Sequence, residues 1–202
     1  LNVSGETSRG FRRAWMTVLA IVIIWSSAGL AMCGGLLPQG KEKIIMPLAV
    51  TSLSFQDNGM IPARHTCDGQ NVSPPRSWTG VPDNAKSLVM IVDDPDTPDP
   101  DAPVTTWVHW VLYNIPPTAN GLPESVGGKN LPPGTLTGTN SWQHTGYGGP
   151  CPPVGNHRYY HKLYALDAML PDLHHPTKAA LERAMGNHII ARAELIGRYR
   201  RH

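Results

Sequence analysis

Two short stretches of this chain carry the side chains that could do chemistry. Residues 93–110 read DDPDTPDPDAPVTTWVHW, and residues 146–167 read GYGGPCPPVGNHRYYHKLYALD. An aspartate that accepts a hydrogen bond from an imidazole orients the ring and favours its cationic form, which binds anions. Two histidines and two aspartates could also bind a metal ion. Anion binding is the first chemistry that these residues suggest, and metal-dependent hydrolysis is the second.

The second stretch changes from a loop into a strand. Its first part is rich in Gly and Pro, and its last part is a run of aromatic and aliphatic residues, which predicts a stiff loop that leads into a buried strand. Side chains alternate along a strand, so His157 and Tyr159 point to one side and Arg158 to the other. Gly148 and Gly149 carry no Cβ and allow a ligand or another backbone to come close.

The first stretch follows an apolar run, residues 87–92, that predicts a central strand buried on both faces. The five Asp and four Pro of residues 93–103 exclude a helix and predict a loop. A further strand is expected over residues 107–115. Asp-Pro segments are often simple turns in which Asp bonds to the backbone, and this alternative stays open.

Two carboxylates would repel an anion unless their charges are neutralised. We expect an Asp to accept a hydrogen bond from one imidazole and to raise the pKa of at least one ring. His157 is expected to donate to the ligand, together with loop N–H groups near Gly148 and Gly149. The sequence contains no G-x-S-x-G, P-loop, dinucleotide-binding or H-E-x-x-H motif, which argues against the common enzyme classes.

These stretches resemble the phosphatidylethanolamine-binding protein family in its bacterial YbhB/YbcL-like (Raf kinase inhibitor-like) branch. The resemblance rests on the D-P-D-x-P segment at residues 94–98, on His109-Trp110, and on the G-x-G-G-P-x-P-P-x-G-x-H-R-Y motif at residues 146–159. Residues 67–75, 184–188 and 193–197 also look like this branch. The resemblance extends from about residue 48 to residue 200.

The resemblance implies a large β core with little helix and a small pocket that binds a phosphate-like anion or a phospholipid headgroup. It implies a non-catalytic binding protein without a cofactor or a bound metal. The implied pocket residues are Asp94, Asp96, Trp107, His109, Tyr147, Gly149, Pro150, His157 and Tyr159. Names used in the family also mention inhibition of kinases and proteases, so a protein-binding inhibitor with an unidentified partner is the alternative.

Composition supports a β-rich fold. The chain has 202 residues with 20 Gly, 20 Pro and few helix-forming runs, which favours a mainly β, antiparallel two-sheet sandwich. Strands are expected over residues 50–55 and 189–199. One short helix is expected over residues 176–185, capped by Thr177, and at most one more near the C-terminus. The formal net charge of +2 argues against nucleic acid as a partner.

The N-terminal residues predict export. Arginines precede an apolar run at residues 14–25, which is typical of a secretory signal and short for a membrane span. Residues 1–33 are interpreted as a signal peptide or an N-terminal membrane anchor, and residues 34–47 as a flexible tether to a domain at residues 48–202. Leu30-Ala31-Met32-Cys33 resembles a lipoprotein cleavage box in which Cys33 would be lipidated, although Met32 departs from the pattern. The expected location is the cell envelope or outside the cell.

Two further cysteines remain if Cys33 is lipidated or removed. An exported domain with two cysteines is a candidate for a disulfide, and two separate buried thiols are the alternative. The family resemblance places the loops of Cys67 and Cys151 around one pocket, so we predict a disulfide between them.

Overall fold

The computed structural model describes residues 46–127 and 130–201. The predictions for the signal or anchor at residues 1–33, for lipidation of Cys33, and for nearly all of the tether lie outside the described residues.

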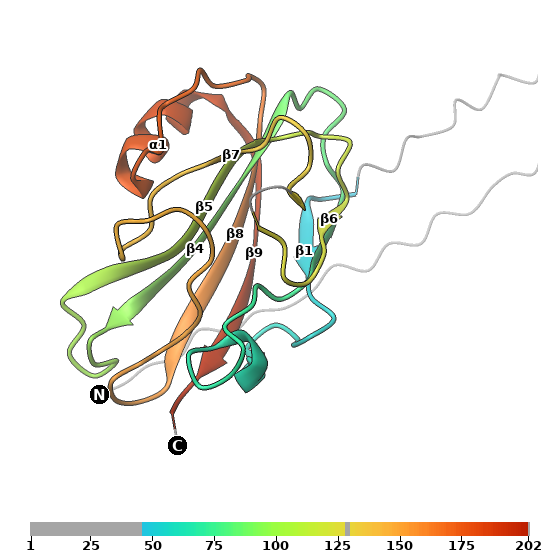
Figure 1. Ribbon diagram of the computed structural model, residues 1–202. Helices are drawn as coiled ribbons and strands as arrows, with labels where there is room; N and C mark the ends of the chain where they lie inside the picture. The colour runs from blue at the N-terminus through green and yellow to red at the C-terminus, as the bar shows by residue number, and fades with distance from the viewer. Residues whose placement is uncertain (1–45, 128–129, 202) are drawn as a thin grey trace, which may run out of the picture. The chain divides into compact units, whose positions relative to one another are not determined.

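A six-stranded sheet forms the body of the fold (Figure 1). Its strands, in spatial order, are β2 (Gly59–Met60), β9 (Ile189–Tyr199), β8 (His157–Leu166), β4 (Ser87–Thr97), β5 (Thr105–Ile115) and β7 (Leu136–Thr137). Neighbouring strands are antiparallel except for β2 and β9, which run parallel. The four long strands lie in the middle, so the site residues on β4, β5 and β8 lie side by side.

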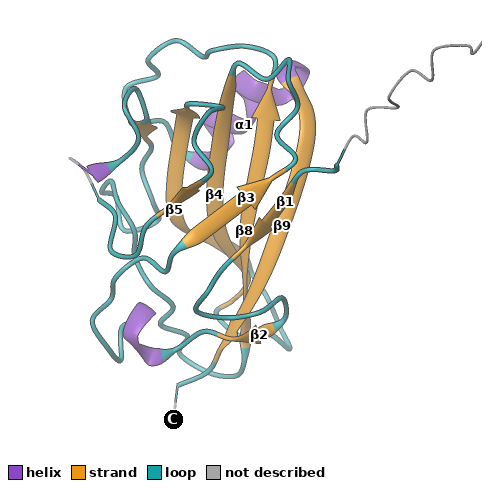
Figure 2. Ribbon diagram, turned by 90° about the vertical axis from the view of Figure 1, so that its right-hand side faces the viewer, coloured by secondary structure: helices purple, strands orange, loops and turns teal. Residues whose placement is uncertain are grey.

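A second, three-stranded sheet completes the sandwich. It consists of β1 (Ala49–Thr51), β3 (Arg76–Thr79) and β6 (Gly121–Leu122), in the order β1-β3-β6. This sheet lies on one face of the large sheet, and helix α1 (Lys178–Met185) lies on the opposite face, as two directions of view show (Figures 1 and 2). The predicted mainly β, two-sheet fold with a short helix near the C-terminus is confirmed.

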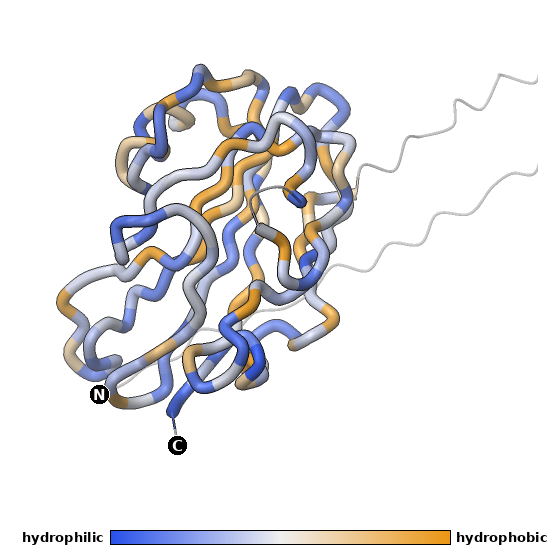
Figure 3. The backbone as a smooth tube through the Cα atoms, in the orientation of Figure 1, coloured by the Kyte–Doolittle hydropathy of each residue, from blue (hydrophilic) through white to orange (hydrophobic). Residues whose placement is uncertain are grey.

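Strand β4 is buried on both faces because its alternating side chains fill two apolar cores. Met90 and Val92 belong to the core between the sheets, and Val89 and Ile91 belong to the core beneath α1. Figure 3 shows that hydrophobic residues are concentrated along the central strands. This burial agrees with the predicted central strand.

Helix α1 lies within the predicted residues 176–185, starts at Lys178, and has the predicted cap, Thr177. The Thr177 hydroxyl accepts a hydrogen bond from the Ala180 N–H, and Leu181 and Met185 are buried beneath the helix. Two short 3-10 helices, η1 (Ala63–His65) and η3 (Gly186–His188), are also present. No helix among the described residues is both long and apolar enough to span a membrane.

Three strand predictions need correction. The first strand covers only Ala49–Thr51 and not residues 50–55. Strand β4 continues through Asp93 to Thr97, where a loop was predicted, because both neighbours keep pairing with it: Asp93 lies opposite Tyr160 of β8 and Thr97 opposite Thr105 of β5. The short strands β6 and β7 lie in segments for which no strand was predicted, and each pairs with a strand distant in sequence.

Candidate binding pocket

A cavity of about 580 Å³ opens where β4 ends and β5 begins. Its walls are mostly apolar and come from Pro98, Val104, Trp107, Trp142, Pro152 and Pro153, together with Cys151. Its polar lining residues are Asp94, Thr97, Thr105 and His109. The size is that of a small-molecule site, and the few polar groups would orient a ligand within apolar walls.

Asp94 and His157 form a buried pair at this cavity. The Nδ1 atom of His157 lies 2.7 Å from Oδ2 of Asp94, and Nε2 of His157 donates to the Val154 carbonyl across 2.9 Å. The other Asp94 oxygen accepts from the Asp96 N–H. Burial raises the pKa of Asp94, and the hydrogen bond from His157 lowers it. Both ring nitrogens of His157 are therefore used within the protein, so the prediction that His157 donates to a ligand is wrong.

His109, and not His157, has a ring nitrogen that is not used within the described part of the protein. Its Nδ1 donates to the Gly148 carbonyl across 2.7 Å, and its Nε2 is buried without a hydrogen-bond partner among the described residues. Burial lowers the pKa of His109 to about 4, although the Gly148 carbonyl and Asp93 act in the opposite direction. The expectation that nearby carboxylates raise the pKa of an imidazole does not hold for His109.

Tyr159 lies beside both groups. Its ring meets the His109 ring edge-on, with 5.2 Å between the ring centres. Its hydroxyl is buried and makes no hydrogen bond of good geometry among the described residues, although it interacts with the nearby Asp94 carboxylate. Burial and then the Asp94 charge raise the pKa of Tyr159 well above its usual value, so the hydroxyl stays protonated and can donate a hydrogen bond.

Asp96 does not line the cavity, because Arg158 holds its carboxylate on the other side of β8. The Arg158 guanidinium donates to both carboxylate oxygens, across 2.9 and 2.6 Å, and its backbone N–H donates to one of them. These hydrogen bonds lower the pKa of Asp96. Asp93, which is fully buried, forms ion pairs with Lys162 and Lys178. The acidic charges around the site are thus neutralised inside the protein.

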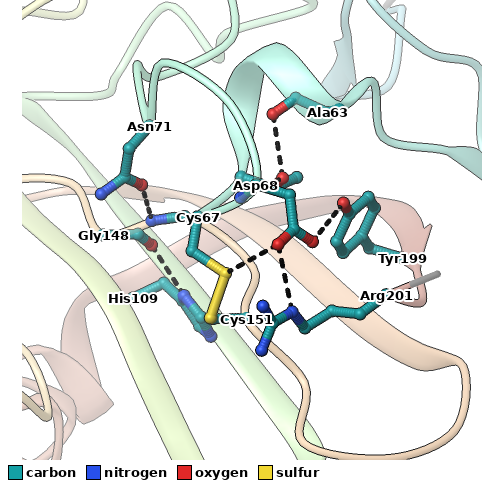
Figure 4. The surroundings of a disulfide bond; sticks show 11 residues. Ala63, Cys67, Asp68, Asn71, His109, Gly148, Cys151, Tyr199 and Arg201 are labelled. Atoms are coloured by element: carbon teal, nitrogen blue, oxygen red, sulfur yellow. Dashed lines mark hydrogen bonds and ion pairs between the residues drawn. A yellow bond between two sulfur atoms is a disulfide. The ribbon is translucent and has the colours of Figure 1, made fainter.

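Two loops are tied together beside the pocket (Figure 4). Cys67 and Cys151 form the predicted disulfide, with 5.4 Å between their Cα atoms. The Cys67 N–H also donates to the Pro150 carbonyl, and the Gly149 N–H donates to the Asn71 side chain across 2.7 Å. Cys151 lines the pocket, so the disulfide joins its wall to the loop at residues 67–71.

Three other predicted residues, Tyr147, Gly149 and Pro150, do not line the cavity and pack against neighbouring segments instead. Tyr147 donates to the His65 carbonyl and packs edge-on against Trp110, so its hydroxyl is used away from the cavity. Gly149 and Pro150 are buried against the loop at residues 65–71, which Gly149 approaches so closely that a Cβ would lie 2.4 Å from the His65 oxygen. Of the nine predicted residues, Asp94, Trp107 and His109 line the cavity.

Sequence reasoning missed several lining residues, of which Trp142 is the most important. Its ring meets the Trp107 and His109 rings edge-on, with 5.4 and 5.2 Å between ring centres. A tryptophan in a loop of small polar residues is unusual and was the available signal. Val104 and Pro153 had no comparable signal, because exposed apolar residues in loops are common.

The described residues do not assemble a metal-binding group of three or more His, Cys, Asp or Glu side chains. The oxygens of Asp94 and Asp96 are already paired with His157 and Arg158. The aspartates of the predicted His/Asp cluster are therefore neutralised by their partners and do not present free ligands for a metal ion. The cluster also contains the buried His109 Nε2 and the buried Tyr159 hydroxyl.

The fold and the pocket define a β-sandwich binding protein whose small site lies at the ends of the central strands. The chain belongs to the phosphatidylethanolamine-binding protein family, whose family model matches residues 51–200.

Relatives in archaea and bacteria share most of the chain. A UPF0098 protein of Methanothermobacter thermautotrophicus is 50% identical over 149 residues, which cover 73% of this chain and 95% of the relative. A UPF0098 protein of Pyrococcus horikoshii is 42% identical over 189 residues, covering 91% and 87%.

Two solved structures have a similar fold. One is a putative phosphatidylethanolamine-binding protein homologue, CT736, of Chlamydia trachomatis, with 41% identity and a TM-score of 0.71 over 77% of this chain and 99% of that chain. The other is E. coli YbcL, described as a new member of the mammalian PEBP family, with 32% identity and a TM-score of 0.71 over 78% and 100%.

Proposed function

We propose that this chain is an exported, non-catalytic binding protein whose pocket takes a phosphate-like anion or the headgroup of a phospholipid. The observation that carries this proposal is the buried Nε2 atom of His109, a residue that lines the cavity, because this atom lacks a hydrogen-bond partner among the described residues. Unpaired buried polar groups are costly, and a bound polar ligand would satisfy them. The polar lining residues and the apolar walls suit a headgroup that is joined to a less polar part.

The neutralised carboxylates support anion binding. Asp94 is paired with His157, and Asp96 is paired with Arg158, so neither presents an uncompensated negative charge to the ligand. The same pairing supports a non-catalytic role, because it leaves His157 without a free nitrogen that could act as a general base toward a bound molecule.

Export is proposed from the signal-like N-terminus and from the disulfide. Disulfides persist in oxidising compartments, such as the periplasm and the outside of the cell, and are rare in the cytosol. The bond between Cys67 and Cys151 supports such a location for the folded domain. Membrane association would come through the N-terminus, by lipidation of Cys33 or by an uncleaved anchor.

Native mass spectrometry of the protein purified from its exported location tests the binding function. We expect a copurified phosphate ester or phospholipid that is displaced by added phosphoethanolamine. A protein that carries nothing and does not bind phosphoethanolamine, phosphate or phospholipid in titration calorimetry would contradict the proposal.

Cell fractionation tests the location separately. The full chain should appear in the envelope or the medium, and Cys33→Ala should leave the membrane fraction if Cys33 is lipidated. Accumulation of the full chain in the cytosol would contradict export.

A further inference from the structure

Strand β9 has an outer edge that is paired over only part of its length. Within residues 46–127 and 130–201, the strands beside β9 are β8 on one side and β2 on the other, and β2 pairs with it only at Gly197 and Arg198. Figure 2 shows β9 along the outer side of the large sheet, with β2 beside its last part. An open edge presents N–H and C=O groups to which a further strand can be added.

The backbone groups of Arg192 and Glu194 face this open edge. The N–H of Ile196 donates to the Asp57 carboxylate across 2.9 Å, and its C=O accepts from the Asn58 N–H across 2.7 Å, so both groups point away from β8. Backbone direction alternates along a strand, and β9 pairs with β8 without a register shift over this part. The N–H and C=O groups of Arg192 and Glu194 therefore point outward in the same way as those of Ile196.

The side chains of this segment differ between its two faces. Arg192 and Glu194 are exposed on one face, and neither side chain makes an ion pair or a hydrogen bond with another described residue. Ala191 and Ala193 point to the other face, where they are half-buried and pack against the core between the sheets. The open edge thus combines a small apolar strip with one positive and one negative charge.

We propose that this edge is an interaction surface for a second copy of the chain, and that two β9 strands pair antiparallel about a two-fold axis at Ala193. A two-fold axis brings the same patch of both copies together, so the patch must complement itself. In this register Arg192 lies directly opposite Glu194 of the partner subunit, and the outward backbone groups of such a pair exchange both of its hydrogen bonds. Ala191 lies opposite Leu195 of the partner subunit, which continues the apolar face.

Charge and backbone direction select this register. A shift by one residue would place outward backbone groups opposite inward ones. A shift by two residues would place Arg192 opposite Arg192, or Glu194 opposite Glu194, and like charges directly opposite each other are destabilising. Charges commonly protect an edge strand against pairing. Here the two charges are opposite in sign and share one face, so the edge repels a shifted copy and attracts a copy in the proposed register.

Cysteine cross-linking tests the register in the full chain. Ala193→Cys places two thiols at the axis, where the Cα atoms of a directly opposite pair are about 4.5 Å apart, within the range that a disulfide spans. Ala191→Cys is the matched control on the same face of the strand, because its counterpart in the partner would be about 14 Å away. We expect a reductant-sensitive covalent dimer of the exported Ala193→Cys protein on gels. Ala191→Cys and the unmodified chain should give at least about tenfold less of it.

Charge reversal tests the recognition itself. Arg192→Glu and Glu194→Arg each bring like charges together at two symmetric places, so each should raise the dimer dissociation constant about tenfold or more in sedimentation equilibrium. The double change restores opposite charges and should return the constant to within about threefold of the original. Lys86→Glu is the control, because this exposed cation precedes β4, which β8 separates from β9. Circular dichroism and thermal unfolding establish that each variant is folded.

Three outcomes would overturn the inference. A monomer at every concentration, without a cross-link in Ala193→Cys, would show that the charges protect the edge or that another segment of the chain covers it. A dimer that neither charge reversal weakens would place its interface elsewhere. Equal cross-linking in Ala191→Cys and Ala193→Cys would indicate unspecific collision. The proposed ligand binding is tested separately, since Arg192 and Glu194 pair with the later part of β8 and the pocket lies near its first residue.

Discussion

The Nδ1 atom of His157 lies 2.7 Å from Oδ2 of Asp94, and both side chains are almost completely buried. The contact joins the first residue of β8 to a residue near the end of β4, 63 residues earlier in the chain. It neutralises the one carboxylate that lines the pocket and occupies the imidazole that would otherwise face a ligand. The pair therefore determines both the charge of the pocket and which histidine is left to act in it.

The first prediction concerns this pair. His157→Ala should lower the free energy of unfolding by about 3–5 kcal/mol, because it leaves the Asp94 carboxylate buried without a partner. Asp94→Asn combined with His157→Ala should cost less than the sum of the two single changes. Urea unfolding of the four proteins measures this coupling.

The control is His188→Ala, which removes a half-exposed histidine 2.9 Å from Asp167. This surface pair has the same chemistry, and its loss should change stability by no more than about 1 kcal/mol. Equal losses for His157→Ala and His188→Ala would contradict the account of the buried pair.

The second prediction compares two adjacent glycines. A Cβ on Gly149 would lie 2.4 Å from the His65 carbonyl oxygen and 2.9 Å from the Thr66 Cα, so backbone would have to move. A Cβ on Gly148 would meet the Trp142 ring at 2.4 Å, and this side chain, on a residue that is 39% exposed, can shift more readily than backbone can. Gly149→Ala should destabilise the protein by about 1–3 kcal/mol or more. Gly148→Ala should mainly change ligand affinity.

Thermal unfolding together with ligand titration of both variants measures this difference. A larger loss of stability in Gly148→Ala than in Gly149→Ala would be inconsistent with the packing described for the two positions.

The third prediction concerns the disulfide. Cys67 and Cys151 are 84 residues apart, and a cross-link over such a segment is expected to stabilise the fold by about 4 kcal/mol. Reduction, or the double change Cys67→Ser with Cys151→Ser, should lower stability by that order and weaken ligand binding, because Cys151 lines the pocket. Unfolding with and without reductant, with free thiols counted, provides the measurement.

Asn71→Ala is the control for the neighbouring hydrogen bond. It removes the acceptor of the Gly149 N–H and keeps the disulfide, so its cost should be smaller, about 1–3 kcal/mol. Unchanged stability after the thiols are shown to be free would rule out the proposed role of the cross-link.

The fourth prediction concerns acid. The Nδ1 atom of buried His161 lies 2.6 Å from the Arg76 guanidinium, and burial and then Arg76 lower the pKa of His161 well below its usual value. The pKa of His109 is also lowered, to about 4. In the unfolded chain both rings titrate near 6.5. The unfolded state thus binds more protons below this pH, and stability should fall as pH drops from 7.5 to 5.

Each such ring contributes up to about 1.4 kcal/mol per pH unit to this loss. His161→Gln should make the dependence shallower by that amount below pH 6. The pKa of Asp94 is raised in the folded protein, so this carboxyl acts in the opposite sense and makes stability rise as its protonation sets in at lower pH. Urea unfolding at several pH values provides the test, and identical slopes in the variant and the original protein would contradict it.

The local sequence pattern was sufficient to predict several features of the fold. The alternation of residues 157–165 predicted the faces of β8, since the pleat of a strand sets side-chain direction whatever its neighbours are. The capped helix near the C-terminus and the doubly buried strand β4 followed from local signals in the same way. The motifs at residues 94–98 and 146–159 indicated the family, and their loops and strands do meet at one pocket.

Only the tertiary structure decided which imidazole keeps a ring nitrogen at the pocket without a partner among the described residues. His109 finds its carbonyl partner 39 residues away, and His157 finds its carboxylate 63 residues away. Strand periodicity places a ring on a face of a sheet, but the use of each nitrogen depends on groups that packing brings within 3 Å. Continuation of β4 through Asp93 was likewise decided by distant segments, because its pairing partners lie on β5 and β8. The cations that neutralise buried Asp93 come from β8 and α1.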